Sequence, residues 1–434
     1  MGHIIDTDHE YRLLQRTLNH KISGAPESPT LTKILKLLWS PEEAELARRL
    51  PSSPQPLEVL ARKLGMPQDE LGDKLTLMAQ RGVVMDLEFE GKRYFSLPPV
   101  VIGFFEFTFM RARDDMPMAE LARLFHEYMT DDDRFSRAVF QGETQFGRSL
   151  VHEEALPQGD HVEVLDWERA SHIVLSASAV SVGLCQCRHK ASHLGKTCEK
   201  PALACLTFNY AAESVARCGH ARPITTGEAM KILQECKEAG LVQTGDNVQR
   251  NVTYICNCCG CCCGMIDAIK RFDLRHAIVT SNWIREVDLS KCKGCGLCAK
   301  VCPVEAIQIA EEGEGKQKRK WAVCDDSLCL GCGVCYPACK SGGIVMKPRA
   351  KRVFTPETVF DRTVAMAIER GKLADIIFDN PDKLSYRALG RVVNILEKSP
   401  PFRAAMAIEP LRSNFLKNVV KNAKKTSPLA KNVG

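Results

Sequence analysis

The chain has 434 residues, 45% of them hydrophobic, which is enough for about three domains with apolar cores. The net charge of +6 is uneven, because the segment from Lys347 to the end carries 18 Lys and Arg against 8 Asp and Glu and leaves a charge of −4 on the first 346 residues. The first residues contain neither a basic nor an apolar signal region, so the 21 cysteines argue against a secreted disulfide protein and for a soluble, cytoplasmic one.

The first 97 residues predict several helices followed by a β-hairpin. After an N-terminal helix and linker over residues 1–29, Leu31 to Leu38 has the apolar spacing of an amphipathic helix, and Ser40-Pro41-Glu42-Glu43 has the capping pattern that begins another. The elements that follow are helices over 57–64 and 68–80 and a hairpin over 83–97. This order resembles a winged helix-turn-helix domain over residues 30–97.

The charge of this region argues against DNA as a partner. The expected recognition helix, residues 67–81, has Lys74 and Arg81 against three acidic residues, and residues 57–96 carry a net charge of −1. Because neutralisation of phosphates drives nucleic-acid affinity, a net-acidic surface is poorly suited to DNA. We therefore expect a protein-interaction or structural role, with DNA binding as the alternative.

Residues 98–180 predict a helical connector. Its longest apolar run, Val100 to Met110, contains Glu106 and has about half the length that a membrane helix requires, so we expect no membrane span. A further helix is expected from Asp166 to Val182, at the end of the connector.

Two blocks of cysteines mark a cysteine-rich α/β domain over residues 181–282. They are Cys185, Cys187, Cys198 and Cys205 in the first block and Cys256, Cys258, Cys259, Cys261, Cys262 and Cys263 in the second. Neighbouring cysteines form disulfides with one another poorly, whereas a metal centre can collect thiolates from both blocks. A helix over 225–240 and a strand over 253–255, similar to an abbreviated second winged motif, would deliver the second block. We expect at least one additional Fe–S cluster here, with a zinc site or a catalytic or redox-active thiol set as the alternatives.

Other residues of this domain have simpler interpretations. Arg188 is expected to donate hydrogen bonds near an anionic cluster, and His189 and His193 are expected at the surface, although both have the chemistry of ligands. The remaining cysteines stand alone and are expected to be buried or half-buried apolar side chains; they are Cys218, Cys236 and Cys324.

Residues 283–347 contain two regular cysteine runs. The first is Cys292-x-x-Cys295-x-x-Cys298-x-x-x-Cys302-Pro303, and the second is Cys329-x-x-Cys332-x-x-Cys335-x-x-x-Cys339. Three thiolates at every third position come from one loop around an inorganic core, a pattern typical of two [4Fe–4S] clusters. Zinc sites favour cysteine pairs over such triplets, which leaves two zinc sites as a weak alternative.

The two runs resemble the repeated motif of bacterial dicluster ferredoxins, in which the fourth cysteine of each run binds the other cluster. The resemblance implies one cluster on Cys292, Cys295, Cys298 and Cys339 and a second on Cys329, Cys332, Cys335 and Cys302. Positive φ is expected at Gly294, Gly296, Gly331 and Gly333, and strands are expected at 283–287, 306–309 and 343–346. The chain departs from the pattern at Lys340, where a proline is usual, and in a charged insert over 311–320.

Residues 348–434 predict a basic, helical C-terminal tail. Apolar residues have helical spacing over 359–377 and 389–396. Such charge is ordinary for a solvated face, and docking onto an acidic redox partner is the alternative.

As a whole, the sequence resembles a group of multidomain 4Fe–4S ferredoxin-type proteins of anaerobic bacteria that have a winged-helix front and a Cys-Asn-Cys-Cys-x-Cys-Cys-Cys block. The resemblance implies a multidomain α+β fold and one-electron transfer between a redox donor and a redox acceptor, as a relay or as a subunit of an anaerobic oxidoreductase. A redox-sensing transcriptional regulator and an Fe–S reductase acting at the Cys256 block are the other candidates. Neither a dinucleotide fingerprint nor a phosphate-binding loop accompanies the cysteines.

Overall fold

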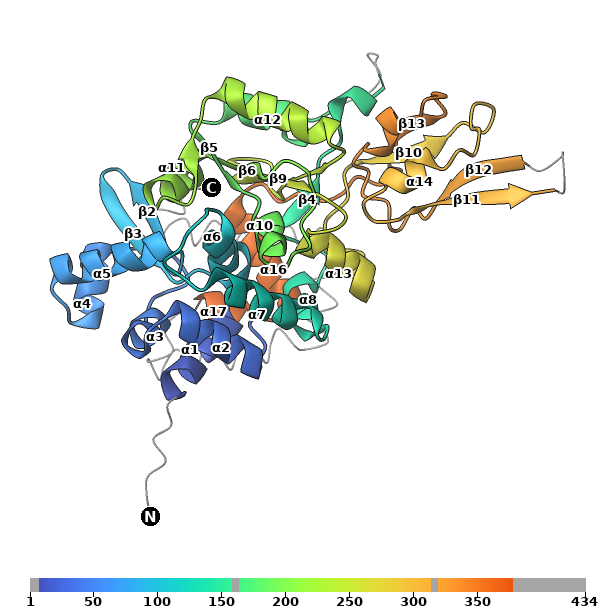
Figure 1. The fold of residues 1–434 in the computed structure, drawn as a ribbon. Coiled ribbons are helices and arrows are strands. Elements are labelled where there is room, and N and C mark those ends of the chain that lie inside the picture. Colours follow the sequence, from blue (N-terminus) through green and yellow to red (C-terminus); the bar gives the residue numbers. More distant parts are fainter. Residues whose placement is uncertain (1–7, 158–163, 314–318, 378–434) are drawn as a thin grey trace, which may run out of the picture.

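The computed structural model describes residues 8–157, 164–313 and 319–377. Figure 1 shows helices at the N-terminal side, a β-sheet at the centre and a strand-rich module that projects from one side. Helix and sheet are thus mixed, and several units share the chain, as expected for a multidomain α+β protein. Within the described ranges, no helix combines the length and apolar character that a membrane crossing needs.

The N-terminal helices begin where the sequence places their caps. The Ser28 and Ser40 hydroxyls accept hydrogen bonds from the backbone of Leu31 and Glu43, which satisfies N–H groups that have no partner inside the helix. The elements are α1 (His9–His20), α2 (Pro29–Leu38), α3 (Pro41–Arg48), β1 (Gln55–Pro56), α4 (Leu57–Leu64), α5 (Gln68–Arg81), β2 (Met85–Phe89) and β3 (Lys92–Ser96). The three strands form a sheet of order β1-β3-β2, so the hairpin predicted over 83–97 is present.

The connector packs onto these helices through aromatic side chains. Its elements are η1 (Val100–Phe104), α6 (Phe105–Phe109), α7 (Met118–Thr130) and α8 (Arg134–Phe140). The rings of Trp39 and Phe104 lie 5.1 Å apart in an edge-to-face arrangement, and those of Phe105 and Phe125 lie 4.9 Å apart. One apolar core therefore joins the N-terminal helices to the connector.

A six-stranded antiparallel sheet forms the centre of the molecule, in the order β4-β8-β9-β6-β5-β7. Its strands are β4 (Gly147–Ser149), β5 (Val180–Leu184), β6 (Leu203–Phe208), β7 (Arg222–Pro223), β8 (Val242–Asp246) and β9 (Tyr254–Cys258). The helices around it are η2 (Glu153–Ala155), η3 (Asp166–Glu168), α9 (Ala170–Ser176), α10 (Gln186–His193), α11 (Asn209–Arg217), α12 (Thr226–Glu238) and α13 (Gly264–Phe272).

One local prediction in this region was wrong, and another is met by the local elements but not by the sheet as a whole. The helix expected from Asp166 to Val182 ends at Ser176, because the β-branched Val180 and Val182 pair with β6 as part of β5. The abbreviated winged motif is present as α12 and the paired strands β8 and β9, and β9 delivers the second cysteine block, but both strands are also part of the central sheet. Pairing with a distant strand overrides the local helical pattern at Val180 and Val182.

The projecting module has the two-fold organisation expected from its cysteine runs. Its elements are β10 (Trp283–Val287), α14 (Leu297–Val301), β11 (Ile307–Glu312), β12 (Arg319–Cys324), α15 (Cys335–Ala338) and β13 (Ile344–Pro348). Strand β10 pairs with β13, and β11 pairs with β12. Both ends of the charged insert extend the β11–β12 hairpin, which reaches outward in Figure 1.

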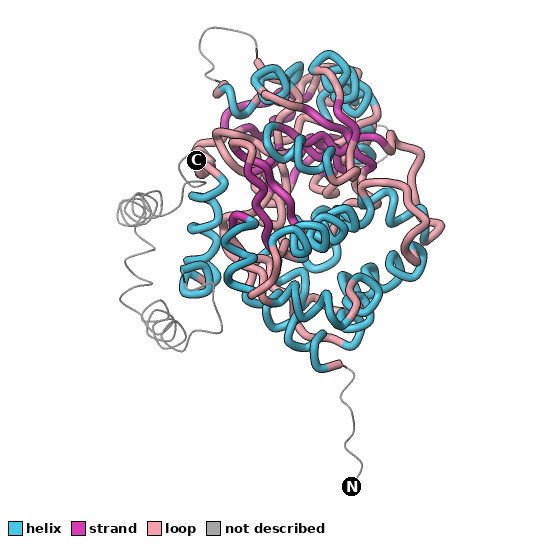
Figure 2. The backbone as a smooth tube through the Cα atoms, turned by 90° about the vertical axis from the view of Figure 1, so that its left-hand side faces the viewer, coloured by secondary structure: helices cyan, strands magenta, loops and turns pink. Residues whose placement is uncertain are grey.

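After the module, the chain returns to the N-terminal helices through α16 (Val359–Arg370) and α17 (Leu373–Ile377). The Arg370 guanidinium donates to the carbonyl of Ile22 at 2.9 Å, and the Lys372 amine donates to that of Asn19 at 2.8 Å. Figure 2 shows these helices at the side of the helical part. The helix predicted over 389–396 lies outside the described residues.

Candidate functional site

Cys302 lies with the first three cysteines of the second run, which are Cys329, Cys332 and Cys335, in the projecting module. Burial and the neighbouring thiols of Cys329 and Cys302 raise the pKa of Cys335 to about 12, and burial with the same neighbours raises that of Cys332. Burial beside neighbouring thiols disfavours the thiolate forms of Cys332 and Cys335, and a metal cluster would stabilise them. The backbone N–H of Ala306 donates to the Cys302 sulfur at 3.3 Å. This arrangement suits a [4Fe–4S] cluster.

The set implied for the other cluster lies toward the outer end of the module. Cys292, Cys298 and Cys339 share one apolar cluster, whereas Cys295 is exposed. Backbone N–H groups of Ala322 and Gly343 donate to the sulfurs of Cys292 and Cys339 at 3.5 and 3.2 Å. Such N–H···S bonds offset negative charge and raise a cluster's reduction potential.

The glycines of both runs have the predicted backbone conformation. The φ angles of Gly294, Gly296, Gly331 and Gly333 are +60°, +77°, +67° and +80°. At Gly331 a Cβ atom would lie 2.1 Å from the carbonyl oxygen of Trp283. Glycine is therefore required there for the cysteine loop to reach strand β10.

Sequence reasoning missed Arg285, which lies beside cysteines of both expected ligand sets. Its side chain is 6% exposed, its Nε and Nη2 atoms make no hydrogen bond among the described residues, and its charge acts on the thiols of Cys298 and Cys335. Those cysteines belong to different ligand sets. The signal in the sequence is alternation along β10, which places Arg285 on the same face as Trp283 and Val287.

In the cysteine-rich domain, the ten candidate cysteines separate into two groups. The first, called here the six-thiol group, consists of Cys185, Cys187, Cys205, Cys256, Cys258 and Cys263. Strand register places Cys205 opposite Cys256, and the thiol of Cys258 contacts those of Cys256 and Cys263. Cys187, on the first turn of α10, in turn contacts Cys185 and Cys263. Each thiol therefore contacts the next one, and the group forms a row that begins at Cys205 and ends at Cys185.

The second, called here the four-thiol group, consists of Cys198, Cys259, Cys261 and Cys262. Its sulfur atoms all lie within 4.8 Å of one another. The Cys262 thiol and the Cys262 backbone N–H, which lies 3.4 Å from the Cys259 sulfur, help to lower the pKa of Cys259 to about 3. Cys259 is therefore the thiol of the group whose thiolate form is favoured, and thiolates are the form that binds metals.

Arg188 lies between the two thiol groups. It is 2% exposed, and its Nη1 atom donates to the carbonyl of Asn257 at 3.1 Å. Its Nε and Nη2 atoms make no hydrogen bond among the described residues, and its charge lies beside Cys185 and Cys259. A buried guanidinium with free donors suits an anionic thiolate centre, the environment expected from the sequence.

Of the single cysteines, Cys236 packs against Cys198, Cys259 and Cys262 of the four-thiol group. His189 Nδ1 lies 2.8 Å from the carbonyl of Phe109, and His193 is exposed and lies 3.3 Å from the His189 ring nitrogen Nε2. Cys218 and Cys236 are 6% and 0% exposed, and Cys324 is half-buried, in agreement with apolar packing roles.

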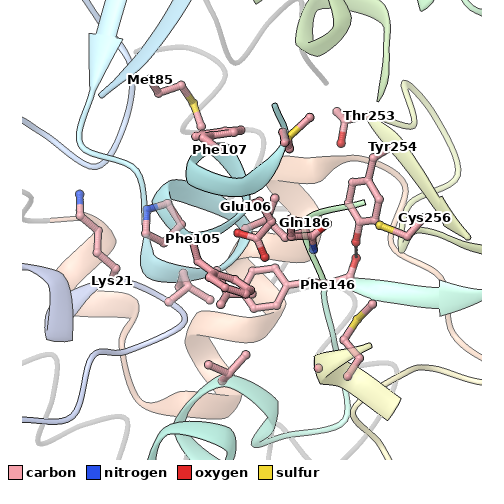
Figure 3. Close-up of a pocket in the computed structure, with 18 of the residues that line it drawn as sticks. Lys21, Met85, Phe105, Glu106, Phe107, Phe146, Gln186, Thr253, Tyr254 and Cys256 are labelled. Atoms are coloured by element: carbon pink, nitrogen blue, oxygen red, sulfur yellow. Dashed lines mark hydrogen bonds between the residues drawn. The ribbon is translucent and has the colours of Figure 1, made fainter. Parts of the chain in front are cut away.

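A cavity of about 1490 Å³ lies between the N-terminal helices, the connector and the cysteine-rich sheet. Figure 3 shows Glu106, Phe107, Tyr254, Gln186 and Cys256 around it. Glu106 accepts a hydrogen bond from the Gly103 backbone at 2.8 Å, and burial raises its pKa to about 8, so a neutral carboxylic acid faces the cavity at neutral pH. In the sequence, the only sign of this acid is a single charge within an apolar run.

The projecting module contacts the cysteine-rich domain directly. Cys332 and Val334 share an apolar cluster with Cys258 and Cys263. A Cβ atom on Gly260 would lie 2.8 Å from the carbonyl oxygen of Pro303, so the two backbones meet closely. The ligand set with Cys302 therefore lies next to the cysteine-rich domain.

Comparison with known proteins bears on the module. Residues 291–350 match the family described as 4Fe-4S dicluster domain. The chain carries a 4Fe–4S ferredoxin-type module. Twenty-seven residues are 56% identical to the pyruvate synthase subunit PorD of Methanothermobacter marburgensis, which is 6% of this chain and 33% of that protein. The match thus spans about a third of the relative's length, and no solved structure is significantly similar to the chain. Iron–sulfur electron transfer is the chemistry that this module supports.

Proposed function

We propose that this protein is an electron relay within an anaerobic oxidoreductase, with two [4Fe–4S] clusters in the ferredoxin-type module and a further Fe–S cluster in the six-thiol group. The contact between Gly260 and Pro303 carries the proposal, because it seats the Cys302 ligand set against the cysteine-rich domain. An isolated carrier would have no need of this fixed contact. The match to the dicluster family supports the first two clusters.

The proposed electron path runs along the module. Cys295 is exposed at the outer end, where a redox partner can approach, and Cys332 is buried at the inner end. Large apolar side chains are exposed on this module; among them are Leu289, Leu297, Tyr336 and Val345. Apolar surface of this kind is common where a partner docks. We propose a redox donor or acceptor protein at this end, as in a multisubunit synthase.

The cluster count tests the proposal. Two [4Fe–4S] clusters supply about eight iron and eight sulfide ions per chain, so protein purified without oxygen should exceed eight of each if the six-thiol group holds a cluster. A truncated chain ending before Trp283 should then stay brown and sensitive to oxygen. A truncated chain that stays colourless and iron-free after reconstitution would refute the further cluster. The iron content of the full chain would still show whether the module holds its two clusters.

An Fe–S reductase is the second candidate, and the cavity favours it. The Cys256 thiol and the neutral Glu106 carboxyl line the same cavity, so an apolar substrate there would meet an electron source and a proton donor. A naphthoquinone probe would take two electrons from the clusters and two protons to give the hydroquinone. Reduced protein should reduce it more slowly after Phe107→Trp, which fills the cavity, or Glu106→Gln. Equal rates in all three proteins would exclude this site.

We propose that the winged-helix segment contacts protein rather than DNA. Both basic side chains of α5 are already paired, because Lys74 lies 2.7 Å from Glu70 and Arg81 lies 2.6 Å from Glu43. They are therefore poorly placed to neutralise phosphates. A mobility-shift assay with mixed duplex DNA should show no binding at physiological salt. Sequence-specific binding that Lys74→Glu abolishes would favour the regulator instead.

A further inference from the structure

We propose that the four-thiol group binds one tetrahedral zinc ion, which is separate from any Fe–S cluster. This inference rests on the spacing of four sulfur atoms and does not depend on the proposed electron relay. It assigns Cys198, Cys259, Cys261 and Cys262 to a structural metal and leaves the other six candidate cysteines to the redox centre.

The spacing fits a single ion. A Zn–S bond of about 2.3 Å in tetrahedral geometry places the sulfur atoms about 3.8 Å apart. The Cys198 sulfur lies 3.9 Å from that of Cys259 and 4.0 Å from that of Cys262, and the Cys261 and Cys262 sulfurs lie 3.7 Å apart. A cubane would insert four iron and four sulfide ions among its thiolates, so its ligand sulfurs would stand much further apart.

The six-thiol group has a different arrangement. Among the described residues, the four-thiol group is the one set of at least three potential ligands whose donor atoms share this mutual spacing. The six-thiol contacts instead form a row from Cys205 through Cys256 and Cys258 to Cys263 and Cys187. A row of thiols that extends over a sheet and two helix ends can surround a larger inorganic core. Four thiols in a compact tetrahedron cannot.

The local chain has the form of a zinc-binding turn. Cys259, Gly260, Cys261 and Cys262 form a tight turn after β9, and Cys198 comes from the loop after α10. The backbone N–H of Cys262 already donates to the Cys259 sulfur, as such groups do around structural zinc. Three ligands from one turn and one from a distant loop would tie the two cysteine blocks together.

Charge balance supports the same assignment. Four thiolates around Zn²⁺ carry a net charge of −2, which is costly to bury without a nearby cation. The Arg188 guanidinium lies beside Cys259, is 2% exposed, and has two nitrogen atoms that make no hydrogen bond among the described residues. These donors can face the sulfurs of a zinc tetrathiolate.

The position of the turn indicates what the zinc would do. Gly260, inside the turn, touches the backbone of Pro303 in the ferredoxin-type module. Zinc would fix this turn and so hold the surface on which the module rests. Structural zinc sites contribute directly to folding free energy, so loss of the ion should loosen this contact.

Metal analysis of the full chain tests the proposal. Protein purified without oxygen and supplied with both iron and zinc should contain one zinc per chain, and Cys259→Ser and Cys262→Ser should each lose it while iron stays constant. Cys218→Ser is the matched control, because Cys218 packs in the N-terminal core with no cysteine of either group, and it should keep both metals. Loss of iron with retention of zinc in the two variants would overturn the proposal.

A measurement on the unmodified chain covers the case in which those variants do not fold. Zinc-edge X-ray absorption should show four sulfur neighbours at about 2.3 Å. Replacement of zinc by Co²⁺ should give the intense visible bands of a tetrahedral thiolate site. Zinc bound through nitrogen or oxygen, or the absence of zinc from the reconstituted full chain, would equally refute the assignment.

Discussion

A single block of nine residues, 256–264, supplies thiols to both the six-thiol group and the four-thiol group. Cys256 and Cys258 alternate on strand β9 and so face the same side of the sheet, together with Cys205 on the next strand. Strand β9 then ends, and the turn after it places the next three cysteines beside Cys198 in the four-thiol group. Cys263, at the start of α13, rejoins the first group. Position along the block therefore decides which thiol group each cysteine joins.

Two serine substitutions should distinguish the ends of the ferredoxin-type module. Cys295→Ser and Cys332→Ser should each lose or convert one cluster, but Cys332 is 9% exposed and packs against the cysteine-rich domain, whereas Cys295 is exposed. A buried unpaired hydroxyl costs roughly 1–3 kcal/mol, so Cys332→Ser should also unfold at a lower temperature. Iron, sulfide and EPR spin counts with thermal melts measure both effects. Unchanged cluster content in both variants would refute the ligand sets.

Arg285 should set the potentials of the two clusters together. Its buried positive charge lies beside Cys298 and Cys335 and favours the more negative reduced clusters. Arg285→Met should therefore lower both midpoint potentials, on the order of tens of millivolts. Lys347→Met on the exposed part of β13 is the control and should change them little. A redox titration followed by EPR that finds equal shifts in the two variants would contradict this role.

Glu106 should make the stability of the protein depend on pH. Burial raises its pKa from 4.5 to about 8, so between these values the native state keeps a proton that the unfolded chain releases. The free energy of unfolding therefore falls as pH rises through this window. Glu106→Gln stays neutral and should gain stability relative to the unmodified protein from about pH 5 to about pH 8.

Denaturant unfolding across that pH range measures the difference, with the exposed Glu120→Gln as the control. For Glu120→Gln the difference from the unmodified protein should stay flat. A flat difference for Glu106→Gln as well would show that its carboxyl is ionised in the native state.

At the scale of elements, the turn after β9 forms the close contact between the cysteine-rich domain and the ferredoxin-type module. In Gly260→Ala the new Cβ would lie 2.8 Å from the carbonyl oxygen of Pro303. We therefore expect the free energy of unfolding to fall by roughly 1–3 kcal/mol and electron transfer to the cluster proposed for the six-thiol group to slow. Gly264→Ala, four residues later at the start of α13, meets no atom within 4 Å and should be neutral or slightly stabilising. Electron-transfer rates from flash photolysis and melting temperatures should be measured for both variants. Equal behaviour would show that the contact with Pro303 is unimportant.

Short-range patterns predicted elements well where the interactions are themselves short-range. The capped helices near Ser28 and Ser40 and the positive φ of the glycines in the cysteine runs follow from local chemistry. The partners of a strand in a sheet do not follow from local chemistry. The sequence of β8 and β9 predicts a local hairpin, but nothing in it indicates that β4 and β6 pair with these strands. The helix expected through Val182 failed for the same reason.

At the scale of the whole molecule, three units meet around one cavity. Helices of the N-terminal part and the connector, with Glu106, close it from one side, and the cysteine-rich sheet closes it from the other. The sequence gives no direct sign of such a space, since its walls come from residues more than 300 positions apart. Glu106 shows instead as a single charge within an apolar run, which is where further candidates should be sought.

The most direct test of the electron relay is EPR during stepwise reduction of the full chain without oxygen. Two [4Fe–4S] clusters in one module should give two signals broadened by mutual coupling, and a third signal should remain after the module is removed. The total should approach three spins per chain, and Cys332→Ser should remove the coupling. A chain that accepts fewer than two electrons, or that gives one uncoupled signal, would contradict the relay.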